Sequence, residues 1–162
     1  MYRLIAVLLL SACVATPKAP AVGAFRNTGT PIYSSAVLQT DKLAGRWVQV
    51  AGFGPEGCKP GGADFKTTAK GMQIAYRLCG AGVAQGAGAL KPVGPGRFEV
   101  PGQPGPWWIL WADGDYRTLV IGTPGGGYGY VLNRGNFPPD RLKAARDILE
   151  WNGYDLAQMV VY

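Results

Sequence analysis

The stretch Gly45-Arg46-Trp47-Val48-Gln49-Val50-Ala51-Gly52-Phe53 is the first part of the chain with the pattern of a β-strand. Its valines alternate with larger or mixed side chains, so one face is aliphatic and the other carries aromatic rings at its two ends. Gly45 permits a tight turn before Trp47, whose ring then lies at the start of the strand. A Gly-x-Trp tripeptide is common by chance, so its meaning depends on what surrounds it.

The composition predicts one all-β domain. The chain has 162 residues with 25 glycines and 13 prolines, which favours short strands joined by turns over a helical bundle. The formal charge of +6 comes from basic residues scattered singly, so no nucleic-acid partner is expected. Such a surface is compatible with anionic lipid head groups, although solubility is its usual explanation. The absence of histidine excludes histidine-based triads, histidine-ligated zinc and histidine-ligated haem, and no metal or cofactor is indicated.

The N-terminus predicts export and a lipid anchor. Met1–Arg3 is a positively charged end, and the apolar run Leu4–Leu10 is too short to span a bilayer as a mature helix. The run closes with Leu10-Ser11-Ala12-Cys13, which resembles the bacterial lipobox, in which small residues precede a cysteine that is acylated on sulfur, with chains such as palmitate, and becomes the new N-terminus. The alternative is an ordinary signal peptide with an incidental cysteine. We therefore expect a lipoprotein signal peptide over 1–12 and lipidation of Cys13, where two or three acyl chains anchor a protein stably.

Residue 14 is valine rather than aspartate, which in such lipoproteins implies sorting to the outer membrane, with the domain facing the periplasm. No period holds over 13–40, so this segment is predicted to tether the lipid to a domain over 41–162. Ile32-Tyr33 and Val37-Leu38 are its candidates for packing on that domain, and 41–44 reads as a short helical turn.

Apart from Cys13, the chain contains Cys58 and Cys79. An exported chain meets an oxidising compartment, where an even pair is expected to form a disulfide. Free structural thiols and a redox pair are the alternatives, and the absence of Cys-x-x-Cys spacing disfavours the latter.

Alternating runs follow each other with short connections after Cys58. Their approximate ranges are 63–68, 72–78, 82–92, 97–100, 107–113, 116–121 and 128–134. With the opening strand they make about eight, and the glycine-rich run 82–92 is a weak strand that can bend sharply. We predict an up-and-down antiparallel sheet that removes its edges by closing into a barrel, wide enough inside for a small ligand.

One convincing helix begins at Pro138-Pro139-Asp140 and ends at Asn152-Gly153. Its apolar stripe consists of Leu142, Ala145, Ile148 and Leu149. We expect this stripe to pack on the outside of the barrel, and a short final strand to follow over 156–161.

Over residues 41 to 161 the chain resembles the lipocalins, and more narrowly their lipid-anchored bacterial members and apolipoprotein D. Gly45 and Trp47 fit the family's first motif, Asp113 and Tyr116 the second, and Arg134 the third. The resemblance implies an eight-stranded calyx in which the Arg134 guanidinium stacks on Trp47 and closes one end. The sequence departs from the family at Gly114, where many members have tyrosine, in its glycine-rich middle strands and in the disulfide pairing.

Alternation and the resemblance together predict which side chains point inward. The inward set is Gln49, Ala51 and Phe53 beside Trp47, then Trp107, Ile109 and Trp111, then Tyr128, Tyr130 and Leu132, with Tyr76 in addition. A slip of one residue would invert each set, and Trp108 is expected to face out beneath the helix. These rings either contact a ligand or fill the barrel as core, and for Trp47 filling is favoured.

The predicted function is reversible binding or transport of a small hydrophobic molecule, such as the fatty acids or lysophospholipids that the resemblance implies. The rival from another class is a structural or interaction lipoprotein with a filled barrel. A lipocalin-type enzyme is the weakest alternative, because Asp113 and Asp115 sit at a turn where carboxylates usually cap backbone, so no enzyme is predicted. The sequence gives no prediction of the oligomeric state.

Overall fold

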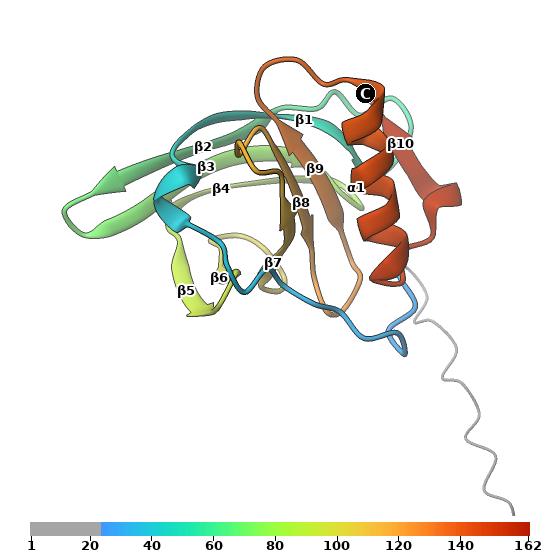
Figure 1. The fold of residues 1–162 in the computed structure, drawn as a ribbon, viewed down its shortest axis with the longest axis horizontal. Helices are drawn as coiled ribbons and strands as arrows, with labels where there is room; N and C mark the ends of the chain where they lie inside the picture. The colour runs from blue at the N-terminus through green and yellow to red at the C-terminus, as the bar shows by residue number, and fades with distance from the viewer. Residues whose placement is uncertain (1–23) are drawn as a thin grey trace, which may run out of the picture.

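The computed structural model describes residues 24–162, in which one antiparallel sheet wraps into a barrel (Figure 1). The strands are β1 (Gly45–Phe53), β2 (Gly62–Thr68), β3 (Gly71–Cys79), β4 (Val83–Ala89), β5 (Lys91–Gly94), β6 (Arg97–Glu99), β7 (Trp107–Ala112), β8 (Thr118–Gly122), β9 (Gly129–Asn133) and β10 (Met159–Val161). Their order is β4-β3-β2-β1-β9-β8-β7-β6-β5, with β10 paired to β1. The predicted up-and-down topology is confirmed.

The barrel closes through one bent strand. β4 pairs with β3, and β5, which follows after Leu90, pairs with β6. The chain thus changes partner at Leu90, whose N–H donates to the carbonyl of Met72 at 2.9 Å. With β10 left out because it lies off the main strand order, and β4 and β5 counted as one bent strand, the barrel has the eight strands predicted. The expected bend in the glycine-rich run is confirmed.

The buried apolar side chains form two separate cores. The inner core points into the barrel, and its largest fully buried members are Trp47, Phe65, Trp107 and Tyr130. The outer core lies between the barrel wall and the helix α1 (Pro139–Trp151), and consists of Ala51, Phe53, Leu110, Val120, Val131, Ala145, Leu149 and Tyr154. Trp108 packs on the outer core, as predicted. A Cβ on Gly129 would lie 2.9 Å from ring carbons of both Phe53 and Tyr154, so only glycine lets β9 approach these rings.

Two β-bulges decide which core a residue joins. In β1, Gln49 pairs with Leu132 and Ala51 with the next residue, Val131, so Val50 is an extra residue. A bulge shifts the alternation by one, and every later side chain changes face. Ala51 and Phe53 consequently lie in the outer core. The prediction that they share the inward face of Trp47 is therefore wrong.

The second bulge lies in β7, where Ile109 pairs with Ile121 and Trp111 with Val120, leaving Leu110 as the extra residue. Trp111 consequently packs on the outer core. The prediction that it points into the barrel is wrong for the same physical reason as for Phe53.

The C-terminal segment matches the prediction except at its last strand. α1 begins after Pro138 and buries Ala145 and Leu149 against the barrel. The expected strand over 156–161 is shorter, because Leu156–Gln158 forms the 3-10 turn η2 and only Met159–Val161 (β10) joins the sheet, by pairing with β1. The side chain of Asp155 accepts a hydrogen bond from the Ala157 N–H, which favours the turn.

Residues 24–44 run along the barrel rather than away from it. Arg26 is buried and donates to the carbonyls of Asn152 at 2.9 Å and Pro124 at 2.6 Å. Figure 1 shows the segment, in blue, running from below α1 to the 3-10 turn η1 (Thr40–Leu43), in cyan. The expected packing holds for Ile32 and Leu38, whereas Val37 is 85% exposed.

The predicted signal peptide and Cys13 lie outside the described residues, as does the first part of the predicted tether. Within residues 24–162, no helix combines the length and apolar character needed to span a bilayer.

Candidate functional site

One end of the barrel is sealed by Trp47 and Arg134. The guanidinium carbon of Arg134 lies 4.2 Å from the centre of a Trp47 ring, a cation–π contact, and the indole N–H donates to the carbonyl of Leu43 at 2.8 Å. Arg134 also donates to the carbonyls of Lys42, Ala44 and Tyr116, which ties η1 to the turn between β7 and β8. The stacking predicted from the sequence is confirmed, and this end of the barrel is structural.

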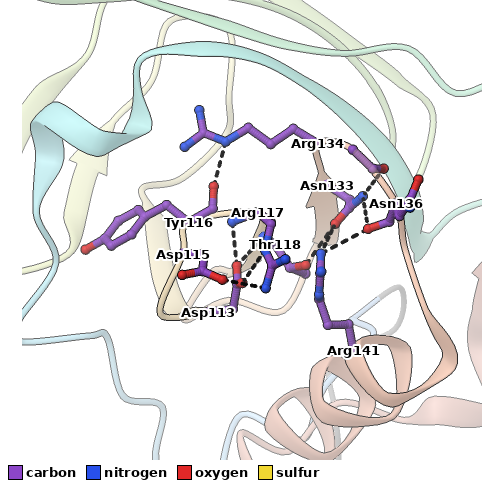
Figure 2. Close-up of polar contacts among 10 residues, drawn as sticks. Asp113, Asp115, Tyr116, Arg117, Thr118, Asn133, Arg134, Asn136 and Arg141 are labelled. Atoms are coloured by element: carbon purple, nitrogen blue, oxygen red, sulfur yellow. Dashed lines mark hydrogen bonds and ion pairs between the residues drawn. The ribbon is translucent and has the colours of Figure 1, made fainter.

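Asp113 of the second motif and the neighbouring Asp115 stabilise the turn between β7 and β8, at the sealed end of the barrel. Asp113 accepts from the backbone N–H groups of Arg117 and Thr118, and Arg117 reaches Asp115 at 2.6 Å (Figure 2). Tyr116 has a φ of 54°, which the Asp113 contacts stabilise. These contacts delay β8 until Thr118, two residues later than predicted. Asp113 therefore caps this turn.

Four aromatic rings cluster in the interior, away from the sealed end. The ring centres of Tyr76 and Trp107 lie 5.5 Å apart, those of Trp107 and Tyr130 5.9 Å apart, and Tyr128 stacks on Tyr130 at 5.1 Å. All four expose at most 6% of their surface. An internal void wide enough for water would leave exposed surface on the rings that line it, so these rings fill the space around them. Their inward direction, like that of Ile109 and Leu132, was predicted correctly.

The connection between β6 and β7, residues 100–106, covers this cluster, and we name it the mouth loop. The hydroxyl of Tyr76 donates to the carbonyl of Pro101 at 2.6 Å, and that of Tyr128 to the carbonyl of Gly105 at 2.7 Å. The amide nitrogen of Gln103 lies 3.5 Å from the Tyr130 hydroxyl. The phenol groups of the cluster therefore hold the loop over the barrel.

Two buried polar atoms, one in the mouth loop and one at the start of β7, have no partner among the described residues. The indole N–H of Trp107 and the amide oxygen Oε1 of Gln103 are both buried without a hydrogen bond among the described residues. Both side chains flank Tyr130. A buried group left unpaired costs about 1–3 kcal/mol. One donor and one acceptor are thus available to a molecule with a polar end.

Burial sets the protonation of the phenols. It raises the pKa of Tyr130 to about 12 and raises the pKa of Tyr76 and Tyr128 as well, because the charged phenolate loses its solvent. The hydroxyl groups of Tyr76 and Tyr128 therefore remain donors to the mouth loop throughout the physiological pH range.

Gln49 points inward as predicted, but its amide is fully used. Its Oε1 accepts from the Cys79 N–H at 2.7 Å and its Nε2 donates to the Cys79 carbonyl at 2.9 Å. The pairing of β2 with β1 ends at Gly62. Beyond that point the side chain of Gln49 connects β1 directly to the end of β3. The predicted disulfide between Cys58 and Cys79 is present at the same place, with 6.1 Å between the Cα atoms.

The candidate site thus consists of Tyr76, Trp107, Tyr128 and Tyr130 with Gln103. Phe53 and Trp111, which the sequence also proposed as ligand contacts, lie outside the barrel. Sequence reasoning missed Gln103, because a polar residue among glycines and prolines reads as an ordinary loop.

Sequence comparison gives no match, either to a family model or to a curated protein. Comparison with solved structures finds similar barrels. The allergen Per a 4 from cockroaches is 13% identical, with a TM-score of 0.59, over 82% of this chain and 92% of its own. Insecticyanin from the tobacco hornworm Manduca sexta is 14% identical, with a TM-score of 0.58, over 82% of this chain and 84% of its own. Lobster apocrustacyanin A1 is 16% identical, with a TM-score of 0.54, over 82% and 88%. At these identities the similarity shows the lipocalin fold, as the sequence predicted, and nothing finer.

Proposed function

We propose that the protein reversibly binds a small hydrophobic molecule with one polar end in the barrel, beneath the mouth loop. The observation that carries the proposal is the pair of buried, unpaired atoms, Trp107 Nε1 and Gln103 Oε1, within a cluster of aromatic rings. Rings supply a large apolar contact area, and a few fixed polar groups orient the ligand. Fatty acids and lysophospholipids are the class that the lipocalin resemblance implies, and transfer of apolar area from water at about 25 cal/mol per Å² drives their binding.

Entry requires the mouth loop to move, because the rings beneath it are closely packed. The loop contains Gly102 and Gly105, and no regular element pairs with it along its length. Breaking its hydrogen bonds to Tyr76 and Tyr128 would uncover the rings. We expect ligand binding to replace these contacts.

A filled barrel with a structural or interaction role is the second candidate, and the close packing of the same four rings favours it. The two candidate functions predict different results for lipid binding. A filled barrel takes up no lipid, whereas the proposed function requires saturable uptake.

Titration of the purified protein with fatty acids and lysophospholipids should quench its tryptophan fluorescence. The quench should be lost in Trp107→Phe and kept in Trp151→Phe, because Trp151 lies at the end of α1 with 64% of its surface exposed. Gln103→Leu should weaken the binding of lysophospholipids about tenfold, because it removes the acceptor for their glycerol hydroxyl, and should not reduce stability. If no lipid in a broad panel binds below millimolar concentration, the binding function is wrong and the filled barrel stands.

We further propose that the protein is an outer-membrane lipoprotein anchored through Cys13 and facing the periplasm, close to the lipid-anchored bacterial lipocalins. The sequence before Cys13 supports this, and the Cys58–Cys79 disulfide agrees with an exported protein. Phe25, which lies 12 residues after Cys13, is held against the barrel because its N–H donates a hydrogen bond to the carbonyl of Gly126. Twelve residues reach at most about 40 Å, so the barrel would stay near the membrane surface.

Cells that express the native chain should incorporate labelled palmitate into it and retain it in the outer-membrane fraction. Cys13→Ala should abolish both the label and the membrane retention, because the sulfur carries the acyl chains. Cys13→Ala protein that still fractionates with the outer membrane would contradict the anchor, without bearing on ligand binding.

A further inference from the structure

The barrel wall has a seam at the bend between β4 and β5. Up to Leu90 the chain pairs with β3, and from Lys91 it pairs with β6, so β3 and β5 share no ladder. The β2–β3 hairpin projects beyond this bend, and η1 lies on the same side of the barrel (Figure 1). Beyond the hydrogen bond from Leu90 to Met72, side chains therefore close the wall here.

A hollow of about 420 Å³ opens at this seam, within the range of about 300–1,000 Å³ that ligand pockets occupy. Its apolar lining comes from Met72, Leu90, Pro92 and Phe98. Leu90 and Phe98 belong to the inner core and Met72 packs against it, so the hollow reaches down to the inner core. It is separate from the mouth loop, whose residues do not line it.

Two lysines mark the edge of the hollow. Lys70, in the turn of the β2–β3 hairpin, and Lys91, just after the bend, line it and are exposed. Within residues 24–162 neither forms an ion pair, although Glu99 lies opposite Lys91 in the β5–β6 ladder. An apolar floor with two available ammonium groups at its edge complements a molecule with an apolar chain and an anionic head.

We propose that this seam is a second binding site, for a single-chain amphiphile with a carboxylate head. The chain lies against Met72, Leu90 and Phe98, and the carboxylate lies between Lys70 and Lys91. The site stands independently of the function proposed for the mouth loop, because the two share no lining residue.

Methionine supplies a local probe. The chain has three methionines, Met1, Met72 and Met159, and Met159 lies with the outer core on the other side of the wall. In the full chain carrying Cys13→Ser and labelled with ¹³C-methyl methionine, dodecanoate should shift the Met72 methyl signal and leave that of Met159 in place. A Met72 signal that stays unmoved at saturating dodecanoate would overturn the site, even if fluorescence shows binding beneath the mouth loop.

Charge provides the second test. Lys70→Ala/Lys91→Ala should weaken dodecanoate binding at Met72 about three- to tenfold, as expected for two exposed charge contacts, and leave dodecanol binding unchanged. Lys59→Ala/Lys143→Ala removes the same net charge from exposed positions outside the hollow and should change neither. An equal effect of the two double variants would show that the lysines do not hold the head group. Gln103→Leu should leave the Met72 response intact, which separates this site from the mouth.

Discussion

Replacing Trp47 by alanine should lower the free energy of unfolding by about 3–5 kcal/mol, the usual cost of removing a large buried aromatic side chain. Trp47 has no exposed surface and fills the sealed end of the barrel. The substitution leaves a cavity there, because the surrounding strands can relax only in part. Urea or thermal unfolding of the two proteins measures the difference directly.

The loss extends beyond the ring itself. Arg134 stacks on Trp47 while it donates to three carbonyls, and Trp47 also donates to Leu43 in η1. Without the indole, both η1 and Arg134 lose the surface on which they pack. The whole sealed end of the barrel should therefore become less stable, although only one residue is changed.

Trp151→Ala is the matched control, since it removes the same side chain from a largely exposed position and should cost less than about 1 kcal/mol. Trp47 has a structural role, so ligand binding should weaken only because the folded population falls. A Trp47→Ala protein with an unchanged melting temperature and no ligand binding would falsify this assignment.

Removing the disulfide with Cys58→Ser/Cys79→Ser should cost about 3 kcal/mol. The bond closes a loop of 21 residues, and chain-entropy estimates for a loop of this size give that value. It joins the connection after β1 to the last residue of β3, beside the Gln49 bridge. Without the bond, the loop over 54–61 should also exchange its amide hydrogens faster.

Reducing agent supplies the control for this pair. It should lower the denaturation midpoint of the native protein to that of the double variant, and leave the double variant unchanged. A native protein whose midpoint is unmoved by complete reduction would show that the Gln49 bridge and the neighbouring strands are sufficient.

Much of the fold follows from local sequence signals. Alternation located most strands and the apolar stripe located α1, whereas the contact between Trp47 and Arg134, almost ninety residues apart, was implied by the resemblance to the lipocalins. Alternation and the apolar stripe are informative because the period of the hydrophobic residues indicates directly which face of an element is buried. The disulfide followed from the cysteine count in an exported chain.

The bulges at Val50 and Leu110 were beyond such reasoning. Neither position is a glycine or proline, and each is an apolar residue followed by another apolar residue. Alternation is correct before each bulge and inverted after it. For this reason Trp107 was placed correctly and Trp111, on the same strand, was not.

The candidate site was predictable in its rings and not in its polar groups. Tyr76, Trp107 and Tyr130 come from strands with a readable pattern, and Tyr128 directly precedes one of them. Gln103 and the mouth loop depend on how a connection folds back over the barrel, which no local period encodes. The same holds for the hollow at Leu90, since it arises from an exchange of strand partners.

The bulge at Val50 has a consequence for cooperativity. It makes β1 a member of both cores, with Trp47 inside the barrel and Phe53 against Tyr154 and Phe25 beneath the helix. A helix whose packing partners take no part in the rest of the core can detach while the remainder of the domain stays folded. Here α1 covers the second half of β1, and the first half of β1 carries Trp47, which seals the barrel. Detachment of α1 would therefore loosen the strand on which the sealed end depends. Barrel and helix should therefore open as one cooperative unit.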